Sequence, residues 1–500
     1  MFNRAPFAGL TWRGVRAAWW SDPRTDLTAG LLVALALIPE AISFSIIAGV
    51  DPRVGLFASF TMAVSIAFTG GRPAMISAAT GAMALVAAPL VQSHGVEYLL
   101  AATVLAGVVQ IALGALGVAK LMRFIPRSVM TGFVNSLAIL IFMAQLPHLT
   151  GKGWQVYVLV GVGLLIIFGL PRIPHVTRFV PAPLVAIIAL TIFTVVTATV
   201  VPTVGDMGEL PDSLPFPVLP DVPFSLGTLA VIAPFSLTLA AVGLLESLLT
   251  AQLVDDATDT PSRKGREARG QGIANVVTGF FGGMAGCAMI GQTMINVKSG
   301  ARTRLSTLSA GVFLLILVVA LGDVVALIPM AALVAVMVFV SIVTFDWSSV
   351  KPRTLRRMPV GETIVMLLTV GVVVATHNLA IGVLAGVLVA AIVFARRVAH
   401  LAEVTSVLDP DGGVRVYAVT GELFFASTNE LLGAFDYTGD PPKVVIDLSD
   451  AHVWDASAVA VLDQVVAKYA RNGVEAEITG LNKPSHAIHE KLSGHLGAGH

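Results

Sequence analysis

The chain has 500 residues, of which 56% are hydrophobic and only 12% are charged, and its mean hydropathy is +0.85. Soluble domains carry about 25% charged residues, so this composition excludes a cytosolic enzyme, a nucleic-acid-binding protein and a disordered chain. The 31 basic residues balance 31 acidic ones, so no overall positive charge points to nucleic acid. The single cysteine, Cys287, excludes a disulfide framework or a CxxC metal site. The composition predicts a polytopic membrane protein.

The N-terminal segment, residues 1–25, combines four arginines with tryptophans such as Trp19 and Trp20. This pattern predicts a helix that lies in the membrane interface; an unstructured lead-in is the alternative. The apolar stretch that follows, Thr28 to Val50, is longer than the apolar region of a cleavable signal peptide. We therefore expect this stretch to be the first membrane span.

Apolar runs alternate with turn-forming or charged residues as far as residue 398. A helix needs roughly 20 apolar residues to cross a bilayer. Runs near this length lie at 26–49, 53–69, 96–118, 126–146, 154–170, 180–200, 227–253, 271–285, 303–321, 323–344, 360–377 and 378–398. Two Gly- and Ala-rich runs, about 78–91 and about 291–302, cover only about half of a ~30 Å hydrocarbon core. Together these runs predict fourteen membrane segments.

Charge placement supports this arrangement of segments. With the N-terminus in the cytoplasm, 23 Lys and Arg residues fall on the cytoplasmic side, and only Arg53 and Lys152 fall outside. Cytoplasmic loops of membrane proteins carry this excess of basic residues. We therefore expect a protein of the cell inner (plasma) membrane with both termini in the cytoplasm.

The two short segments occupy corresponding places in two halves, 26–200 and 227–398, since each is the third of seven. An odd number of crossings in each half gives the halves opposite orientations, so the pattern predicts a 7+7 inverted repeat. Paired interrupted segments in inverted halves point to the substrate site of a transporter.

We expect extended chain at 72–78 and at 286–290 to lead into the two short helices, and such chain must be buried in protein at membrane depth. Two helix N-termini then face each other near the midplane. Each carries about half a positive charge and free N–H groups, so together they suit an anion. The predicted helix starts comprise Thr80, Gly81, Ala82, Gly291, Gln292 and Thr293. The alternative is that the small residues only allow close helix packing.

Two carboxylates, Glu40 and Glu246, lie deep inside predicted spans. An ionised side chain at the bilayer centre costs roughly 2.5–3.5 kcal/mol on insertion scales. Glu40 follows Pro39, which is expected to interrupt the first span. A carboxyl group in an apolar cavity can hold a proton at physiological pH. Both residues are therefore predicted to couple transport to protons; a structural hydrogen bond between helices is the alternative for each.

The last part of the chain has a different composition. From residue 412 onward 17 of 89 residues are charged, against 45 of the first 411. We expect a linker at 399–411 and a soluble domain at 412–500, with a buried strand at 443–448 and a strand pair at 414–418 and 422–425. His486 and His489 have a ligand-like spacing but are expected on a solvated helix face, so no metal and no cofactor are predicted.

Four segments resemble signatures of the sulfate permease (SulP, solute carrier family 26) anion transporters, and the resemblance extends over essentially the whole chain. These segments are Leu37 to Phe44, Asp51 to Ser59, Glu246 to Thr250 and Ser299 to Thr303. The resemblance implies a fourteen-segment fold like that of the uracil permeases. It also implies a core domain (about 26–118 and 227–321) that moves against a gate domain (about 126–200 and 323–398), a homodimer, and a cytoplasmic α/β STAS domain.

By position, the resemblance implies a substrate pocket formed by Glu40, Phe44 and the two helix starts. Glu40 stands where the family often has Gln, and Gln292 stands where some animal members have Arg. Sodium-coupled members tend to have Asp at the position of Glu246. Ala456 and Ala458 interrupt the DSSG pattern of STAS domains, so phosphorylation of Ser457 is not expected.

The sequence therefore predicts a secondary active transporter, not an enzyme, that moves a small anion through the lipid bilayer by alternating access with proton symport. A dicarboxylate is ranked narrowly before sulfate and bicarbonate because of Glu40 and Glu246. The alternatives are a sodium-coupled bicarbonate or sulfate symporter, an anion exchanger, and a membrane scaffold or sensor that signals through the STAS domain. No nucleic-acid partner is expected.

Overall fold

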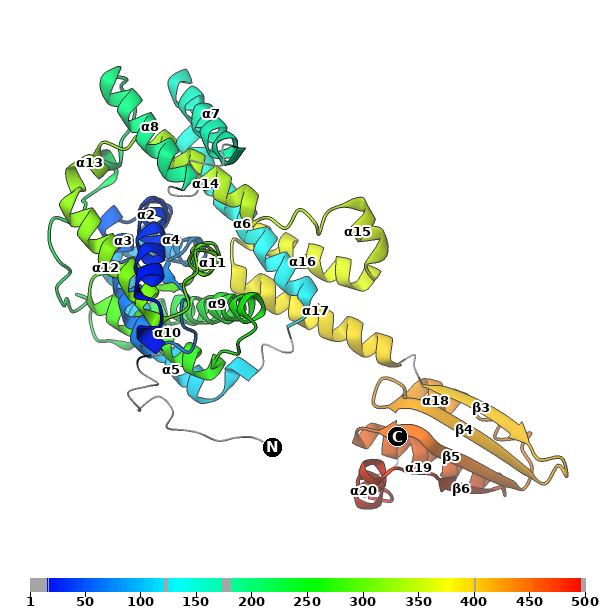
Figure 1. The fold of residues 1–500 in the computed structure, drawn as a ribbon. Helices are drawn as coiled ribbons and strands as arrows, with labels where there is room; N and C mark the ends of the chain where they lie inside the picture. Colours follow the sequence, from blue (N-terminus) through cyan, green and yellow to red (C-terminus); the bar gives the residue numbers. More distant parts are fainter. Residues whose placement is uncertain (1–15, 17, 121–124, 173–180, 400–401, 496–500) are drawn as a thin grey trace. The chain divides into compact units, whose positions relative to one another are not determined.

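The computed structural model describes residues 16, 18–120, 125–172, 181–399 and 402–495 (Figure 1). The chain divides into two compact units, 1–387 and 388–500. Each has its own buried apolar core. The predicted interfacial segment 1–25 lies mostly outside the described residues.

The first half of the membrane region contains most of its elements as predicted. They are α2 Pro23–Ala48, α3 Pro52–Thr69, β1 Ser77–Ala79, α4 Gly81–His94, α5 Val96–Ala115, α6 Arg127–Leu149, α7 Trp154–Gly169 and α8 Ala182–Val196. A short 3-10 turn, Leu170–Arg172, directly follows α7, and another, Val204–Met207, follows α8. α2 continues through Pro39 without a break, so the predicted interruption of the first span is wrong. The carbonyl oxygen of Pro39 accepts a hydrogen bond from the Ser43 hydroxyl at 2.8 Å.

The second half has the same order of long helices around a short strand and a short helix. Its elements are α9 Leu226–Thr258, α10 Lys264–Phe280, β2 Gly286–Ala288, α11 Ile290–Lys298, α12 Arg304–Ala320, α13 Gly322–Ala326, α14 Met330–Thr344, α15 Pro352–Arg357, α16 Val360–Thr376 and α17 Leu379–Ala399. Among the described residues, seven helices are long and apolar enough to cross a membrane, and α8, α12, α14 and α16 are shorter apolar helices. The fold is that of a membrane-spanning helical protein; the inverted repeat itself stays a prediction.

Two predicted spans differ from the structure. The span 323–344 is interrupted between α13 and α14, where the backbone pairs with the outer loop: Val204 N–H donates to Ile328 O at 2.9 Å, and Met330 N–H donates to Pro202 O at 2.8 Å. The span at 271–285 is shifted, because α10 starts at Lys264 and ends at Phe280. Of the basic residues expected in the preceding loop, Lys264, Arg266 and Arg269 therefore lie in the first turns of α10, and Arg263 is its N-cap.

The helices of the first unit pack in two sets. In one set, α5 packs on α10 and α9, and α12 packs on α2 and α3; in the other, α6 packs on α14 and α16, and α7 on α8 and α14. Glycines allow the closest approach: a Cβ on Gly107 of α5 would lie 2.5 Å from the Gly272 carbonyl oxygen of α10. The sets meet where α2 contacts α14 and α8, and where α4 contacts α6.

The second unit contains a four-stranded sheet in the order β3-β4-β5-β6 (Figure 1). Its strands are β3 Glu403–Leu408, β4 Val414–Leu423, β5 Lys443–Val453 and β6 Glu475–Thr479, and its helices are α18 Thr428–Gly433, α19 Ala456–Arg471 and α20 Lys483–Leu492. β3 pairs antiparallel with β4, and the other pairs are parallel.

Two expectations for this unit are corrected. The stretch 399–411 is not only a linker, because it contains the edge strand β3. The predicted pair at 414–418 and 422–425 is one strand, β4, whose register with β5 shifts between Ala418 and Thr420. That irregularity and the following Gly421, which has a φ of 95°, explain why the segment resembled two strands with a turn.

Candidate functional site

A short antiparallel ribbon of two strands lies at the centre of the candidate site. β1 pairs with β2 so that Ala78 is opposite Cys287, and all six strand residues are buried. The pairing supplies hydrogen-bond partners that extended backbone in lipid requires. α4 and α11 each start just after their strand. Because the strands are antiparallel, the two helices leave the ribbon in opposite directions and their N-termini both face it.

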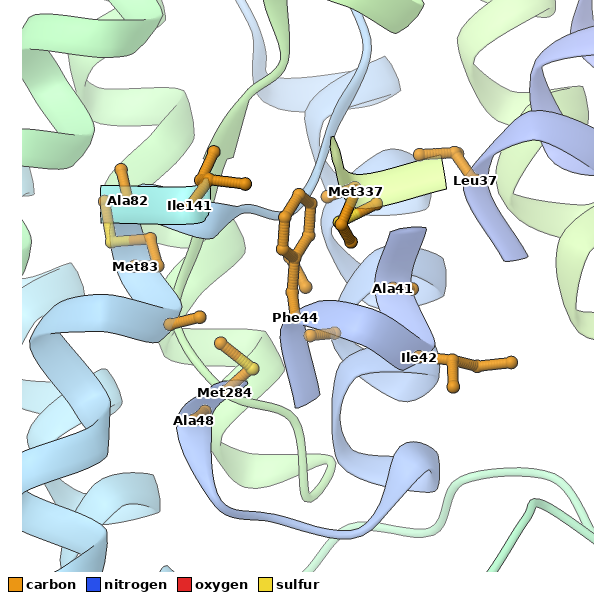
Figure 2. Packing of buried hydrophobic residues seen from close by; sticks show 14 of the residues in the cluster. Leu37, Ala41, Ile42, Phe44, Ala48, Ala82, Met83, Ile141, Met284 and Met337 are labelled. Atoms are coloured by element: carbon orange, nitrogen blue, oxygen red, sulfur yellow. The ribbon is translucent and has the colours of Figure 1, made fainter. Parts of the chain in front are cut away.

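The start of α4 is packed against an aromatic side chain. Thr80 is the N-cap, and its hydroxyl oxygen accepts a hydrogen bond from Met83 N–H at 3.3 Å. A Cβ added to Gly81 would lie 3.0 Å from both Phe44 Cε1 and Ile141 Cδ1. Figure 2 shows the Phe44 ring extending from α2 toward Ile141 and Met337, with Ala82 nearby. Glycine at position 81 therefore allows the Phe44 ring to lie against this helix start.

The start of α11 is more open. The helix begins at Ile290, one residue before the predicted start, and it ends at Lys298 instead of near residue 302. Gly291 is exposed, and no heavy atom lies within 4 Å of the position that a Cβ would take there. The glycine therefore leaves free space directly beside the backbone of the first turn.

The structure brings Glu40 and Gln292 together. Nε2 of the buried Gln292 donates a hydrogen bond to Oε2 of Glu40, which joins α11 to α2. Thr293 points to the ribbon instead: its hydroxyl oxygen accepts a hydrogen bond from Ile76 N–H at 3.0 Å. Thr293 therefore supports the backbone of the site, whereas Gln292 presents an amide donor beside Glu40.

Glu246 lies beside the other helix start. Its Oε2 accepts a hydrogen bond from the Cys287 thiol at 2.8 Å, and the Cys287 sulfur lies 3.2 Å from the Thr80 hydroxyl oxygen. The next residue, Ser247, accepts a hydrogen bond from Ala288 N–H at 3.0 Å. The site thus has one carboxyl group near each helix start, and neither carboxyl group forms an ion pair with a basic side chain among the described residues.

Sequence reasoning missed the roles of Cys287 and Ser247, although both had a signal. Cys287 lies inside the stretch that was expected to run extended at membrane depth, and Ser247 directly follows the buried carboxylate Glu246. Neither residue is ionised, so neither attracts attention as an expensive group in lipid. Their importance follows only from the contact between β2 and α9.

A second buried network, also missed, supports the chain that leads into β1. Glu267 Oε2 accepts hydrogen bonds from Gly71 N–H at 2.7 Å and Arg72 N–H at 3.0 Å. The Arg72 guanidinium lies 3.1 Å from Asp255 Oδ1 and donates to the Thr260 carbonyl oxygen at 2.7 Å. These contacts connect the end of α9, the start of α10 and the segment before β1.

The chemistry of the site is that of neutral donors. In the part of the chain that the structure describes, no group of three or more His, Cys, Asp or Glu side chains is placed to hold a metal ion. The first N–H groups of a helix have no partner within the helix and favour negative charge. With the Gln292 amide and the Thr80 hydroxyl, the two helix starts can bind a small anion without a basic side chain.

Comparison with known families agrees with this architecture. The sequence model of the sulfate permease family matches residues 24–157 and 152–369, and the model of the STAS domain matches residues 407–493. A Bacillus subtilis (strain 168) protein named "Putative sulfate transporter YbaR" is 55% identical over 479 residues, which cover 96% of this chain and 99% of the relative. The bicarbonate transporter BicA of Picosynechococcus sp. is 26% identical over 524 residues, covering 94% and 90%.

Two solved structures are similar to this chain. The transmembrane domain of a cyanobacterial bicarbonate transporter BicA has a TM-score of 0.64 at 25% identity and covers 73% of this chain and 98% of that one. Murine solute carrier 26 family member A9, an anion transporter in its inward-facing state, has a TM-score of 0.81 at 16% identity, covers 98% of this chain and 91% of that one, and shows the fold alone. The chain therefore belongs to the sulfate permease family and carries a C-terminal STAS domain, as the sequence resemblance predicted.

Proposed function

We propose that this protein is a secondary active transporter of a small anion that works as a proton symporter. The observation that carries the proposal is the pair of helix starts on either side of the buried β1–β2 ribbon. Helix N-termini favour anions, and paired interrupted helices mark the substrate site in transporters with two related halves. Names of relatives agree with anion transport, since they specify sulfate and bicarbonate.

The cargo is proposed to bind at Gly291, where the backbone of α11 is open, and to accept hydrogen bonds from Gln292 and from the start of α4 at Thr80, Gly81 and Ala82. Phe44 forms an apolar wall of the pocket. Thr293 acts by holding the ribbon through its hydrogen bond with Ile76. Helix dipoles and neutral donors replace part of the hydration that the anion loses on binding. Because no fixed positive charge holds the anion, it can also be released.

Glu40 gives a physical reason for proton coupling at this site. Its carboxylate accepts the hydrogen bond of Gln292, so it competes with the cargo for that donor and repels a second negative charge. A proton on Glu40 removes the charge and weakens the competition. Glu246 is the second proposed proton carrier, because it is buried and has no basic partner among the described residues.

Alternating access is proposed to move the two helix sets against each other. The set containing α2–α5 and α9–α12 forms the core that holds the cargo, and the set containing α6–α8, α14, α16 and α17 forms the gate. Phe44 and Ile141, which both approach Gly81, lie where the sets meet. A homodimer in the inner membrane, with both termini cytoplasmic, completes the proposal.

Proteoliposome uptake tests this function. The purified chain is assayed with labelled sulfate, bicarbonate and succinate, under an inward proton gradient and with or without sodium. Sulfate is tried first because of the name of the 55% identical relative, and succinate represents the predicted dicarboxylates. We expect the proton gradient alone to drive accumulation of at least one of these anions.

Variants of the two carboxylates complete the test. Glu246→Gln and Glu40→Gln are expected to lose gradient-driven accumulation, whereas Glu362→Gln, in the first turn of α16, serves as the control and should transport like wild type. Uptake that requires sodium and ignores pH would reject the proton symport. Normal accumulation by Glu246→Gln would leave that residue with a structural role only.

A further inference from the structure

Three buried polar side chains from three elements form a continuous chain beside α4. Thr80, the N-cap of α4, is 3% exposed; Cys287 of β2 is 0% exposed; Glu246 of α9 is 6% exposed. The Thr80 oxygen lies 3.2 Å from the Cys287 sulfur, which lies 2.8 Å from Glu246 Oε2. The chain thus connects a carboxyl group to the helix start that is proposed to bind the cargo.

The chain has a direction when Glu246 is ionised. A carboxylate can only accept hydrogen bonds, so the thiol hydrogen of Cys287 points to Glu246. The sulfur is then left as an acceptor, and the Thr80 hydroxyl donates to it. The Thr80 oxygen in turn accepts from Met83 N–H at 3.3 Å. Each hydrogen in the series points toward Glu246, and such series are cooperative.

Protonation of Glu246 reverses this direction. A carboxyl O–H must donate, and the Cys287 sulfur, 2.8 Å from Glu246 Oε2, can accept it. The Thr80 hydroxyl also interacts with this carboxyl group, so the two acceptors compete for the proton. The thiol hydrogen then turns to the Thr80 oxygen, which already accepts from Met83 N–H. The hydroxyl hydrogen of Thr80 loses its acceptor and must find another at the N-terminus of α4. No covalent bond changes except the one between Glu246 and the proton that it takes up.

We propose that the Thr80–Cys287–Glu246 chain transmits the protonation of Glu246 to the anion site, because its reversal turns the Thr80 hydroxyl toward the cargo. Cys287 is a positioning residue, since it acts through Thr80. This proposal rests on the proposed function and deepens it, because it makes proton uptake and anion binding mutually dependent. Binding coupled in this way is reciprocal, and each ligand increases the affinity for the other by the same factor.

The surroundings of Glu246 leave the thiol as its ionisable neighbour. The elements packed on α9 are α4, α5, α10, α11 and β2. Their described ionisable side chains are His94, Glu97, Tyr98, Lys264, Arg266, Glu267, Arg269, Lys298 and Cys287, of which only Cys287 contacts Glu246. The neutral Gln110 and Asn275 hydrogen-bond to each other at 2.9 Å. A change of pH is therefore expected to act on the Thr80–Cys287–Glu246 hydrogen bonds through protonation of Glu246.

The test measures anion affinity as a function of pH without a gradient. Reconstituted full-length protein is assayed for equilibrium exchange, at equal internal and external pH, with whichever of labelled sulfate, bicarbonate or succinate the wild type accumulates fastest. For wild type, the half-saturating concentration is expected to fall about fivefold or more between about pH 8 and about pH 6, as typical coupling energies give. Cys287→Ala is expected to change less than about twofold, and Cys287→Ser, which keeps a donor and an acceptor, should retain the wild-type profile.

The outcomes separate this proposal from the proposed function. A wild type without any pH dependence would reject proton coupling as a whole. If the wild type is pH-dependent and Cys287→Ala has the same pH profile, Cys287 only fills space. That result would reject the Thr80–Cys287–Glu246 connection but not the proposed function. If Cys287→Ala does not yield folded protein by gel filtration, Cys287→Val, which fills the space of the thiol without a donor or acceptor, takes its place: a retained pH profile overturns the proposal, and a flat profile supports it.

Discussion

At the scale of single residues, Gly291 separates the stability of the fold from the binding of cargo. It lies in the first turn of α11, and the position of its absent Cβ borders open space. Gly291→Ala should leave the melting temperature unchanged or slightly raised, because alanine favours helix by about 0.5–1 kcal/mol over glycine. The added methyl group occupies the proposed anion position, so the half-saturating anion concentration should rise about tenfold, equivalent to about 1.4 kcal/mol.

A matched glycine provides the control. Gly371 of α16 is also exposed and also has no atom within 4 Å of a Cβ position. Gly371→Ala should likewise leave the melting temperature unchanged or raised, but it should not change the affinity. Wild-type affinity in Gly291→Ala, measured in the same uptake assay, would remove the start of α11 from the site.

Glu40 is expected to reduce anion affinity at neutral pH. In Glu40→Gln the amide oxygen can still accept from Gln292, but the negative charge is gone. We expect equilibrium exchange at about pH 7.5 to show a lower half-saturating anion concentration than wild type, while accumulation driven by a proton gradient decreases. A higher half-saturating concentration in Glu40→Gln would show that the carboxylate helps to hold the cargo.

The sequence identified some residues of the site and missed others for a physical reason. Glu40 and Glu246 could be found because an ionisable group in an apolar run is expensive. Cys287 and Ser247 are small and neutral, so their presence in a span costs little, and their positions in the extended stretch and beside Glu246 were the only signals. The contact between Glu40 and Gln292 depends on how α2 packs on α11, and residue spacing within one helix cannot specify that distant register.

At the scale of elements, the approach to β1 depends on one buried carboxylate. Glu267 of α10 accepts the N–H groups of Gly71 and Arg72. Glu267→Ala leaves both N–H groups without their acceptor, and each buried unpaired group costs about 1–3 kcal/mol. We expect a loss of about 2–6 kcal/mol in stability, measured by thermal unfolding of the full-length protein in detergent.

The conservative variant tests the cause. Glu267→Gln keeps an acceptor oxygen and should lose markedly less stability than Glu267→Ala. Equal losses in the two variants would mean that the negative charge of Glu267, and not its hydrogen bonds to the backbone, stabilises this segment.

Long helices and the positions of the short segments followed from the sequence, whereas two local features did not. The run is uninterrupted by polar residues from Val324 to Val340, so nothing marked the break except Pro329 itself. The break exists because Ile328 and Met330 pair with Val204 and Pro202 of the outer loop. β3 lies at a sheet edge with mostly exposed side chains, so it lacked the alternating pattern that identifies a half-buried strand. The break depends on pairing between distant segments, whereas β3 pairs with β4, the next strand along the chain.

At the scale of the whole molecule, two separate apolar cores predict two unfolding transitions. The C-terminal core contains Tyr469, whose hydroxyl donates to Asp440 at 2.6 Å. Burial is the main cause that raises the pKa of Tyr469 well above its usual value, and the hydrogen bond to Asp440 raises it further. A raised pKa means that the stabilisation is fully present below about pH 10, the unfolded value, and is lost as pH rises further.

Alkaline unfolding tests this directly. Above about pH 10, ionisation of Tyr469 in the unfolded state should lower the unfolding free energy of the C-terminal unit by about 1.4 kcal/mol per pH unit. The transition is monitored by near-ultraviolet circular dichroism of the full-length chain. Tyr469→Phe should be less stable at neutral pH but should lack this part of the slope. Tyr157→Phe, in the other unit, is the control; an unchanged slope in Tyr469→Phe would assign the alkaline sensitivity elsewhere.

The β1–β2 ribbon also constrains how the cell can produce this protein. Its strands lie in opposite halves of the membrane region, so β1 reaches the bilayer while β2 is still to be synthesised. During that interval the N–H and C=O groups of residues 77–79 have no strand to pair with, at a cost of several kcal/mol for each bare group in lipid. We therefore expect the nascent first half to remain with the insertion machinery until β2 is made, and a chain truncated before β2 not to reach a stable fold.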